Sequence, residues 1–426
     1  MVSQRLPPDF RRLWAALSVT LLGSEITLLA LPLFAATTLH ASAVQMGVLG
    51  AAGQLPFLLL SLPAGILADR VRRRPILIIC DIGSAVLLLS LPLAVPLGGP
   101  YFVQLCAVAF GVGCLTVFSQ VAHYSYVPTL VGRKHLTAVN SRLQVSYSVA
   151  ESGGPGLAGI LVQTITAPFA VLVDAATFVC SAFLLRSIRT PEHRPNEGAP
   201  QVSLLRSLTD GLKFLLSDRL LRPIIATGLL VGLFDNGTLA LYVLYATRTL
   251  HLNAATIGVI FVAGGLGAIP GAVLARWAGD RFGVGRSIIA GLFLTALAGL
   301  AVPLTTGPIA VVFVILALAK ALGALTFTVA NIHQWSLRQA VTPDELAGRV
   351  TAGQRFVVYG GGSLGALFGG FLGNAIGVRG ALIVCAVGGI AAPLCILFSP
   401  VRRLQEQPTD LDIDTDTDTE VEQARG

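Results

Sequence analysis

The chain has 426 residues, of which 54% are hydrophobic and only 12% are charged, and its mean hydropathy is +0.77. This is more apolar surface than one soluble core of that length can hide, so the composition excludes an ordinary soluble domain and predicts an all-α protein that crosses a membrane many times. The net charge of +7 does not indicate nucleic-acid binding, because the basic residues lie in short segments between apolar runs and not on one helix face.

The first 185 residues hold six apolar runs that are long enough to cross a membrane. These runs fall at 13–36, 44–67, 75–95, 100–124, 141–163 and 167–185. No small-residue cleavage site follows the first run, so we expect a retained helix and not a removable signal peptide. Residues 1–185 are therefore predicted to form an N-terminal half of six helices.

A polar segment at 186–222 separates this half from the rest of the chain. It begins with a Pro/Glu/Asn-rich stretch and continues with leucines that recur at helical spacing, namely Leu204, Leu205, Leu208, Leu212 and Leu215. The pattern predicts a cytoplasmic linker that contains an amphipathic helix lying on the membrane surface.

Six more apolar runs follow the linker and predict a C-terminal half at 223–400. They fall at 223–247, 255–276, 286–305, 308–330, 351–376 and 378–399, which brings the expected total to 12 transmembrane helices. Acidic residues then alternate with threonine along 401–426. High charge without aromatic residues predicts a disordered acidic tail.

The two halves share sequence, which indicates an internal duplication. Shifting residues 22–78 forward by 211 gives 18 identities in 57 positions, and Asp69-Arg70 then matches Asp280-Arg281. Farther along the chain the best shift becomes 210, which pairs Gly159 with Gly369. Two six-helix halves in the same order are parallel repeats, so we expect them to surround a central cavity and to rock about it.

A basic loop follows the second predicted helix and reads Gly65-Ile-Leu-Ala-Asp69-Arg70-Val-Arg72-Arg73-Arg74. Positive residues resist translocation, and all but three of the 29 lysines and arginines can lie on one side of the membrane. The exceptions are Arg248, Arg379 and Lys320. Both termini are therefore expected in the cytoplasm.

This loop resembles the motif that follows the second helix in the major facilitator superfamily of secondary transporters, through Gly65, Leu67, Asp69, Arg70, Arg73 and Arg74. It departs from that motif at Arg72, which replaces a glycine, while the second copy keeps Gly283 but carries Arg276 in place of the first glycine. The resemblance covers about residues 10–400. Phe10-Arg-Arg-Leu-Trp14 and Thr342-Pro-Asp-Glu-Leu346 are further similar to the bacterial macrolide-efflux and siderophore-exporter branch.

The resemblance implies a secondary active transporter in the bacterial inner membrane, most simply a proton-coupled exporter of amphiphilic, macrolide-like drugs that works by alternating access. Its partners would be a small-molecule substrate, protons and the lipid bilayer, and the protein would be a monomer. Export of a siderophore or another anionic metabolite is the alternative. A more distant alternative is a non-transporting membrane sensor or scaffold that signals through its acidic tail.

The charged loops are candidates for conformational gating. A carboxylate at Asp69 can accept hydrogen bonds from backbone N–H groups at a neighbouring helix N-terminus, but only while the halves are closed on the cytoplasmic side. The loop would then latch the outward-open state, and its arginines could alternatively serve only to set topology. The predicted gating residues are Gly65, Asp69, Arg70, Arg73, Arg74, Asp280 and Arg281.

Ionisable residues inside predicted spans are candidates for contact with protons or substrate, because an unpaired charge in the bilayer is costly. We count Glu25, Glu151, Asp174, Asp235 and Lys320. A carboxyl group at Glu25 or Asp235 can bind a proton when the cavity is dry and release it when water enters. Lys320 requires a counter-ion, for which Asp235 or a first-half acid is the expected partner, or it binds an anionic substrate. Asp174 is expected to make a structural bond between helices.

Glu151 precedes a glycine-proline segment in the fifth predicted helix, with Gly154, Pro155 and Gly159. The glycines allow close helix contact, and the proline can bend the helix. The segment partly resembles the fifth-helix motif of the superfamily's antiporters but lacks its earlier glycines.

No sequence pattern predicts an enzyme, a bound cofactor or a metal site. There is no nucleotide-binding P-loop and no Ser-His-Asp set, and all six cysteines lie in or beside apolar runs without metal-type spacing. The proton gradient is therefore the expected source of energy.

Overall fold

The computed structural model describes residues 7–98, 101–131, 136–190, 192, 204–343 and 345–406, with no description of the side chains at 62, 66, 68–70, 97, 136–138 and 204–207. All regular structure in these ranges is helical. The first half contains α1 (Pro8–Leu33, continued by a π-helix at Phe34–Thr38), α2 (Ala43–Arg70), α3 (Arg73–Ala94), α4 (Phe102–Val131), α5 (Leu136–Ile165) and α6 (Ala167–Arg186).

A short helix, α7 (Leu204–Ser217), lies between the halves in the sequence. The second half contains α8 (Leu221–Arg248), α9 (Ala254–Phe282), α10 (Val284–Leu304), α11 (Ile309–Val341), α12 (Ala347–Ile376), α13 (Val378–Gly389), α14 (Ala391–Leu397) and a 3₁₀ turn at Pro400–Arg403.

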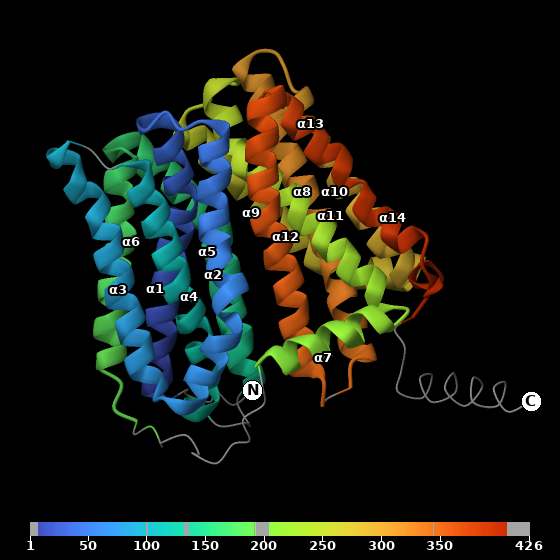
Figure 1. Cartoon of the computed structure of the whole chain (residues 1–426), viewed down its shortest axis with the longest axis horizontal. Helices are drawn as coiled ribbons and strands as arrows, with labels where there is room; N and C mark the ends of the chain where they lie inside the picture. The colour runs from blue at the N-terminus through green and yellow to red at the C-terminus, as the bar shows by residue number, and fades with distance from the viewer. Residues whose placement is uncertain are drawn as a thin grey trace, which may run out of the picture.

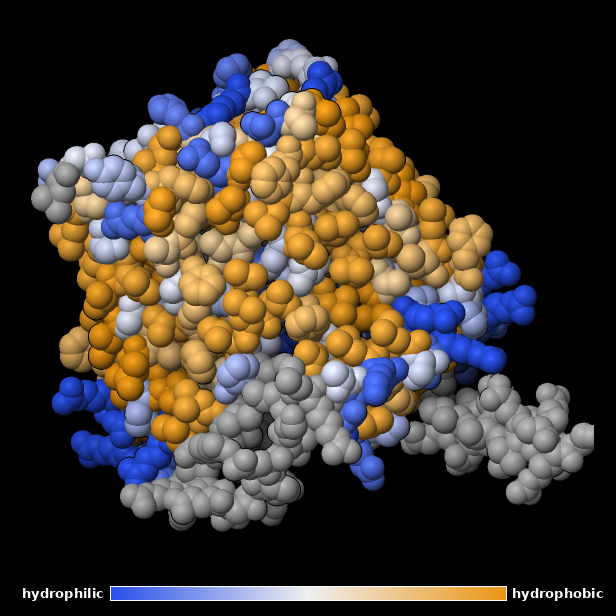
Figure 2. All heavy atoms as spheres, viewed as in Figure 1, coloured by the Kyte–Doolittle hydropathy of each residue, from blue (hydrophilic) through white to orange (hydrophobic). Residues whose placement is uncertain are grey.

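The two halves stand side by side with their helices running between two opposite faces of the molecule (Figure 1). We call the face that carries α7, the start of α1 and the end of α2 the α7 face, and the other one the opposite face. The halves lie close together at the opposite face and their helices diverge toward the α7 face. Hydrophobic residues cover the middle of the viewed surface, and hydrophilic residues gather near its ends (Figure 2). The protein is therefore an all-helical, multi-pass membrane protein.

Eleven helices in the described ranges are long and apolar enough to cross a membrane, and not the 12 that the sequence predicts. The predicted span at 141–163 is the one that this count leaves out. It corresponds to α5, which has 30 residues but a polar first half that includes Asn140, Arg142 and Gln144. All three of these side chains are exposed, and α5 itself packs against α1 and α9. Helix α5 is therefore long enough to cross a membrane, but its polar first half keeps it out of a count that also requires apolar composition.

The duplication is visible in the backbone. His40 and His251, 211 positions apart, both have positive φ angles, of 49° and 53°. Each lies in a short loop before a side-chain cap, from Ser42 on α2 and from Asn253 on α9. The loops at the opposite face are therefore two copies of one structure.

The structure corrects the shift of 210 that pairs Gly159 with Gly369. Helix α12 begins and ends 211 positions after α5. Gly159 and Gly370 each contact a glycine of the other half, Gly258 and Gly47, whereas Gly369 contacts Gly237 within its own half. Because residues 360–370 contain many glycines, an alignment of the two halves finds glycine identities by chance at more than one shift. Sequence identity alone therefore misaligns this segment by one residue.

Helix α7 of the linker and residues 401–405 are both held by packing against the second half. On α7, Gly211 lies against the backbone of α12, and Asp210 Oδ2 accepts from Arg349 Nη1 at 3.1 Å. The acidic tail predicted from 401 begins later, because Val401 is fully buried and the backbone of Leu404 and Gln405 bonds to the start of α10. The rest of that tail, 407–426, lies outside the described residues.

Candidate functional site

Two crossings of glycines join the halves near the opposite face. On α2 and α12, a Cβ atom added to Gly47 would lie 2.9 Å from the Cα of Gly370. On α9 and α5, a Cβ atom added to Gly258 would lie 3.0 Å from the Cα of Gly159, one of the glycines of the predicted fifth-helix motif. Backbones that approach this closely leave no space between the halves at these two points, so the opposite face is closed.

Farther along α2, polar and aromatic contacts continue the boundary. Gln54 Nε2 donates to Asn236 Oδ1 on α8 at 3.1 Å. The rings of Phe57 and Tyr359, on α2 and α12, stack with centroids 4.8 Å apart. The contacts between the halves therefore run from glycine backbones to polar and aromatic side chains with increasing distance from the opposite face.

Two carboxylates of the first half lie together beside this boundary. Glu25 on α1 is half-buried, and its Cβ occupies the space that a side chain at Gly154 would fill. Glu151 on α5 is exposed, one turn before Pro155, and is close enough to Glu25 to interact with it electrostatically. The small residue at Gly154 is what allows the two helices to bring these acids together.

The second half places Asp235 on α8 and Lys320 on α11 around a cavity of about 280 Å³, which α10 also lines. The Lys320 ammonium lies 4.7 Å from the centroid of the Phe261 ring and 5.5 Å from that of Tyr242. Asp235 interacts electrostatically with Lys320, but in the described part of the chain no carboxylate lies within 4.0 Å of the ammonium. Two aromatic faces and a more distant acid therefore surround the lysine.

These two sites differ in what they can bind. The acid pair at Glu25 and Glu151 carries two like charges that repel each other unless a proton or a cation is bound. Lys320 can accept an anionic group because its nearest neighbours are ring faces and not a carboxylate. Among the described residues no group of three His, Cys, Asp or Glu side chains is arranged to hold a metal ion.

Asp174 and a residue that sequence reasoning missed, Asp81, lie inside the first half. Asp174 on α6 is 1% exposed and accepts from Thr27 on α1 and, at 3.1 Å, from Thr177. Asp81 on α3 is 4% exposed and lies near Ser181 on α6, while its Oδ2 has no partner in the described part of the chain. Asp81 falls within the predicted span 75–95, so a complete count of charges inside the spans finds it.

The arginines of the first loop bind the end of their own half. The N–H groups of Arg73 and Arg74 donate to Glu192 at 2.7 and 3.2 Å, and the Arg74 side chain donates to the carbonyls of Leu185 and Arg186. Glu192 thus caps the start of α3. Sequence reasoning missed it, although it is the first acid after α6 in a basic stretch.

The other gating candidates make no described contact across the halves. Helix α2 ends at Arg70, and the side chains of Asp69 and Arg70 lie outside the description. A Cβ atom added to Gly65 would meet nothing within 4 Å. In the second loop, Asp280 Oδ2 lies 3.8 Å from Arg276 Nε on its own helix, and Arg281 is exposed. This arrangement accords with helices that diverge on the α7 face.

Comparison with known proteins assigns the family. The transmembrane secretion effector family matches residues 6–426. The multidrug efflux pump Tap of Mycolicibacterium fortuitum is 26% identical over 95% of this chain and 98% of its own length. The enterobactin exporter EntS of Citrobacter koseri is 25% identical over 94% of each chain.

Solved structures show the same fold. A bacterial homologue of the iron transporter ferroportin in its inward-facing state superposes with a TM-score of 0.74 at 17% identity, covering 92% of this chain and 99% of that one. With the repeated halves, the charged loops and the match along nearly the whole sequence, the chain belongs to the transmembrane secretion effector family of major facilitator transporters.

Proposed function

We propose that the chain is a proton-coupled exporter of amphiphilic drugs that works by alternating access, with its α7 face toward the cytoplasm of a bacterial cell. The acid pair at Glu25 and Glu151 carries this proposal, because it lies beside the boundary of the halves. Protons entering from one side would neutralise the pair, and a cationic substrate would compete with them for it. The arginine-rich ends of the helices on the α7 face support the orientation.

The relatives support the direction of transport. One is named a multidrug efflux pump and another an exporter, and both align over nearly the whole of this chain. The closed glycine crossings at the opposite face fit the state in which such an exporter would load substrate from the cytoplasm.

Transport in proteoliposomes tests this function. Purified protein would be reconstituted and a panel of fluorescent cationic amphiphiles and a macrolide offered with and without an imposed pH gradient. We expect flux of at least one compound that depends on the gradient and collapses when a protonophore is added. Folded protein, checked by circular dichroism, that moves none of the panel under any gradient would contradict the proposal.

The second candidate function is export of an anionic metabolite such as a siderophore, favoured by Lys320. Its ammonium lies beside the rings of Tyr242 and Phe261, and Lys320 lines a cavity in which it can meet an anionic group. A catecholate siderophore offered to the same proteoliposomes separates the two functions. Siderophore flux that Lys320→Ala abolishes would favour this candidate, whereas cation flux that survives the substitution would favour drug export.

A further inference from the structure

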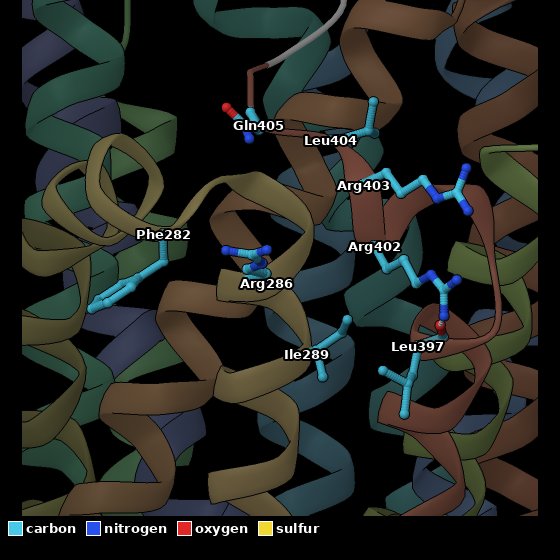
Figure 3. A pocket seen from close by; sticks show the side chains of 8 residues that line it. All are labelled: Phe282, Arg286, Ile289, Leu397, Arg402, Arg403, Leu404 and Gln405. Carbon is cyan, nitrogen blue, oxygen red and sulfur yellow. Dashed lines mark hydrogen bonds between the residues drawn. The ribbon is translucent and has the colours of Figure 1, made fainter.

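The C-terminal half carries a cluster of arginines at the α7 face, at positions whose counterparts 211 residues earlier in the sequence, Pro75, Pro191 and Glu192, are not basic. Arg286 at the start of α10 and Arg402 and Arg403 in the last 3₁₀ turn line one pocket of about 400 Å³ (Figure 3). All three side chains are exposed. We call this pocket the arginine pocket.

No carboxylate neutralises the arginine pocket in the part of the chain that the structure describes. The described ion pairs include none from Arg286, Arg402 or Arg403. Asp280 and Glu406 line a neighbouring pocket with Arg286, but neither lies within 4.0 Å of a guanidinium nitrogen of that arginine. The three arginines therefore line one pocket without a described ion pair, and the acids Asp280 and Glu406 line the adjoining pocket.

Comparison of the two repeats shows that the arginine pocket is more positively charged than the corresponding position of the first half. In the first half, Glu192 accepts from the amides of Arg73 and Arg74 and lies 3.5 Å from the Arg73 guanidinium. In the second half the corresponding amides, at Val284 and Gly285, donate to the backbone carbonyls of Gln405 and Leu404. Position 403, which is 211 residues after Glu192, is an arginine. The second copy thus keeps the backbone bonds and replaces the acid with a base.

The pocket also has an apolar end. Ile289 and Leu397 lie on the side away from Gln405, deeper along α10 and α14 than the arginines (Figure 3). Phe282, which is 52% exposed, adds an aromatic side chain. Guanidinium groups above apolar side chains at the end of membrane helices match a phosphate group above acyl chains.

We propose that the arginine pocket binds the headgroup of an anionic phospholipid. The lipid phosphate accepts hydrogen bonds from guanidinium groups that line this pocket, and its acyl chains lie along Ile289 and Leu397. Because the same segment holds the start of α10, bound lipid would fasten the end of the chain to the loop between α9 and α10.

Native mass spectrometry of the full chain tests this site. The detergent-solubilised protein would be titrated with phosphatidylglycerol and, separately, with phosphatidylcholine. We expect the protein to retain phosphatidylglycerol in preference to phosphatidylcholine. Binding of phosphatidylglycerol should be roughly 10- to 100-fold weaker in the variant R286Q/R402Q/R403Q, because each arginine that is removed loses its attraction to the anionic lipid.

The matched control is R11Q/R72Q/K213Q, which removes the same charge from exposed positions elsewhere on the α7 face. Its binding is expected to stay within about twofold, because only screened long-range attraction is lost. Equal losses in both variants would overturn the proposal. If the triple variant does not fold, Arg403→Glu alone places an acid where the first half has one, and unchanged binding of phosphatidylglycerol to it would also overturn the proposal.

Two further arms identify the occupant. Inorganic phosphate that binds as tightly as phosphatidylglycerol would show a free-anion site and refute the lipid. Deletion of 407–426 removes the acidic tail that follows the pocket in the sequence. We expect unchanged lipid binding after this deletion, and strongly tightened binding would make the tail the occupant in place of the lipid.

Discussion

Gly47 and Gly370 cross so closely that a Cβ atom on the first would lie 2.9 Å from the Cα of the second. The same crossing recurs at Gly258, which is 211 positions after Gly47 in the sequence, and Gly159, which is 211 positions before Gly370. The opposite face is thus closed by one contact that is made twice. Its geometry depends on the absence of side chains, which makes it sensitive to the smallest substitution.

Gly47→Ala is expected to open the opposite face, because the added methyl group meets backbone atoms that cannot rotate away. The closed state should lose roughly 1–3 kcal/mol. Spin labels on the two loops at that face would report the opening as longer distances. Gly53→Ala on the same helix is the control, since a Cβ there meets nothing within 4 Å. Unchanged distances in Gly47→Ala would show that the crossing does not hold the face closed.

Glu25→Gln and Glu151→Gln should uncouple transport from the proton gradient. Each removes one carboxyl of the pair, so the remaining acid no longer has a like-charged neighbour. We expect gradient-driven flux to fall by roughly tenfold or more, the scale of a coupling free energy between two sites, while substrate exchange without a gradient persists. Glu345→Gln, in an exposed loop, is the control. Full gradient-driven flux in both variants would remove the pair from the mechanism.

Asp235→Asn and Lys320→Ala should depend on each other. Removing the lysine leaves Asp235 without its compensating charge, and removing the acid leaves Lys320 with ring faces alone. The loss of unfolding free energy in the double variant should therefore be about 1 kcal/mol smaller than the sum of the losses in the two single variants. Thermal unfolding in detergent measures all four proteins. Additive losses would mean that the two charges do not interact across the cavity.

Glu192→Gln should loosen the start of α3. The neutral amide cannot accept from both backbone N–H groups as a carboxylate does, and its attraction to Arg73 is lost. A loss of about 1 kcal/mol is expected. Hydrogen exchange at the amides of Arg73 and Arg74 should accelerate, while exchange at Val284 and Gly285, which bond to backbone carbonyls, should not. Equal exchange at both sites would contradict a capping role.

Asp69→Asn should impair transport and leave membrane insertion intact if Asp69 holds the α7 face closed in the outward-open state. The neutral side chain weakens any bond to a helix N-terminus. Flux in proteoliposomes and expression level in membranes measure the two effects. Asp280→Asn in the second copy provides the comparison, since its acid already pairs with Arg276. Normal flux in Asp69→Asn would refute the latch.

The fold follows from the sequence because apolar length and the repeat both determine it. The repeat aligns Thr38-Leu39-His40 with Thr249-Leu250-His251, and the structure gives both histidines the same unusual backbone. The helices extend beyond the apolar runs, as α11 does to Val341, because helical backbone continues past the bilayer where side chains become polar. Hydropathy cannot locate such ends. The count of 12 spans stays a prediction, because α5 has the length of a membrane-spanning helix but not the apolar composition of the other eleven.

The candidate site was less predictable, since a sequence does not specify which way a side chain points. Glu25 and Glu151 lie 126 positions apart, and only the packing of α1 on α5 at Gly154 brings them together. The arginines of the first loop looked suited to topology or gating, yet Arg73 and Arg74 bind Glu192 and the end of α6. Contacts between loops of this kind carry no periodic signal.

The cap on α3 and the cap on α10 differ in how freely their sequences can vary. The first depends on one carboxylate, Glu192, so few other residues can replace it there. The second is made by main-chain carbonyls of Leu404 and Gln405, which almost any amino acid can supply. After the duplication, positions at the end of the second half were therefore free to acquire new side chains without loss of the fold.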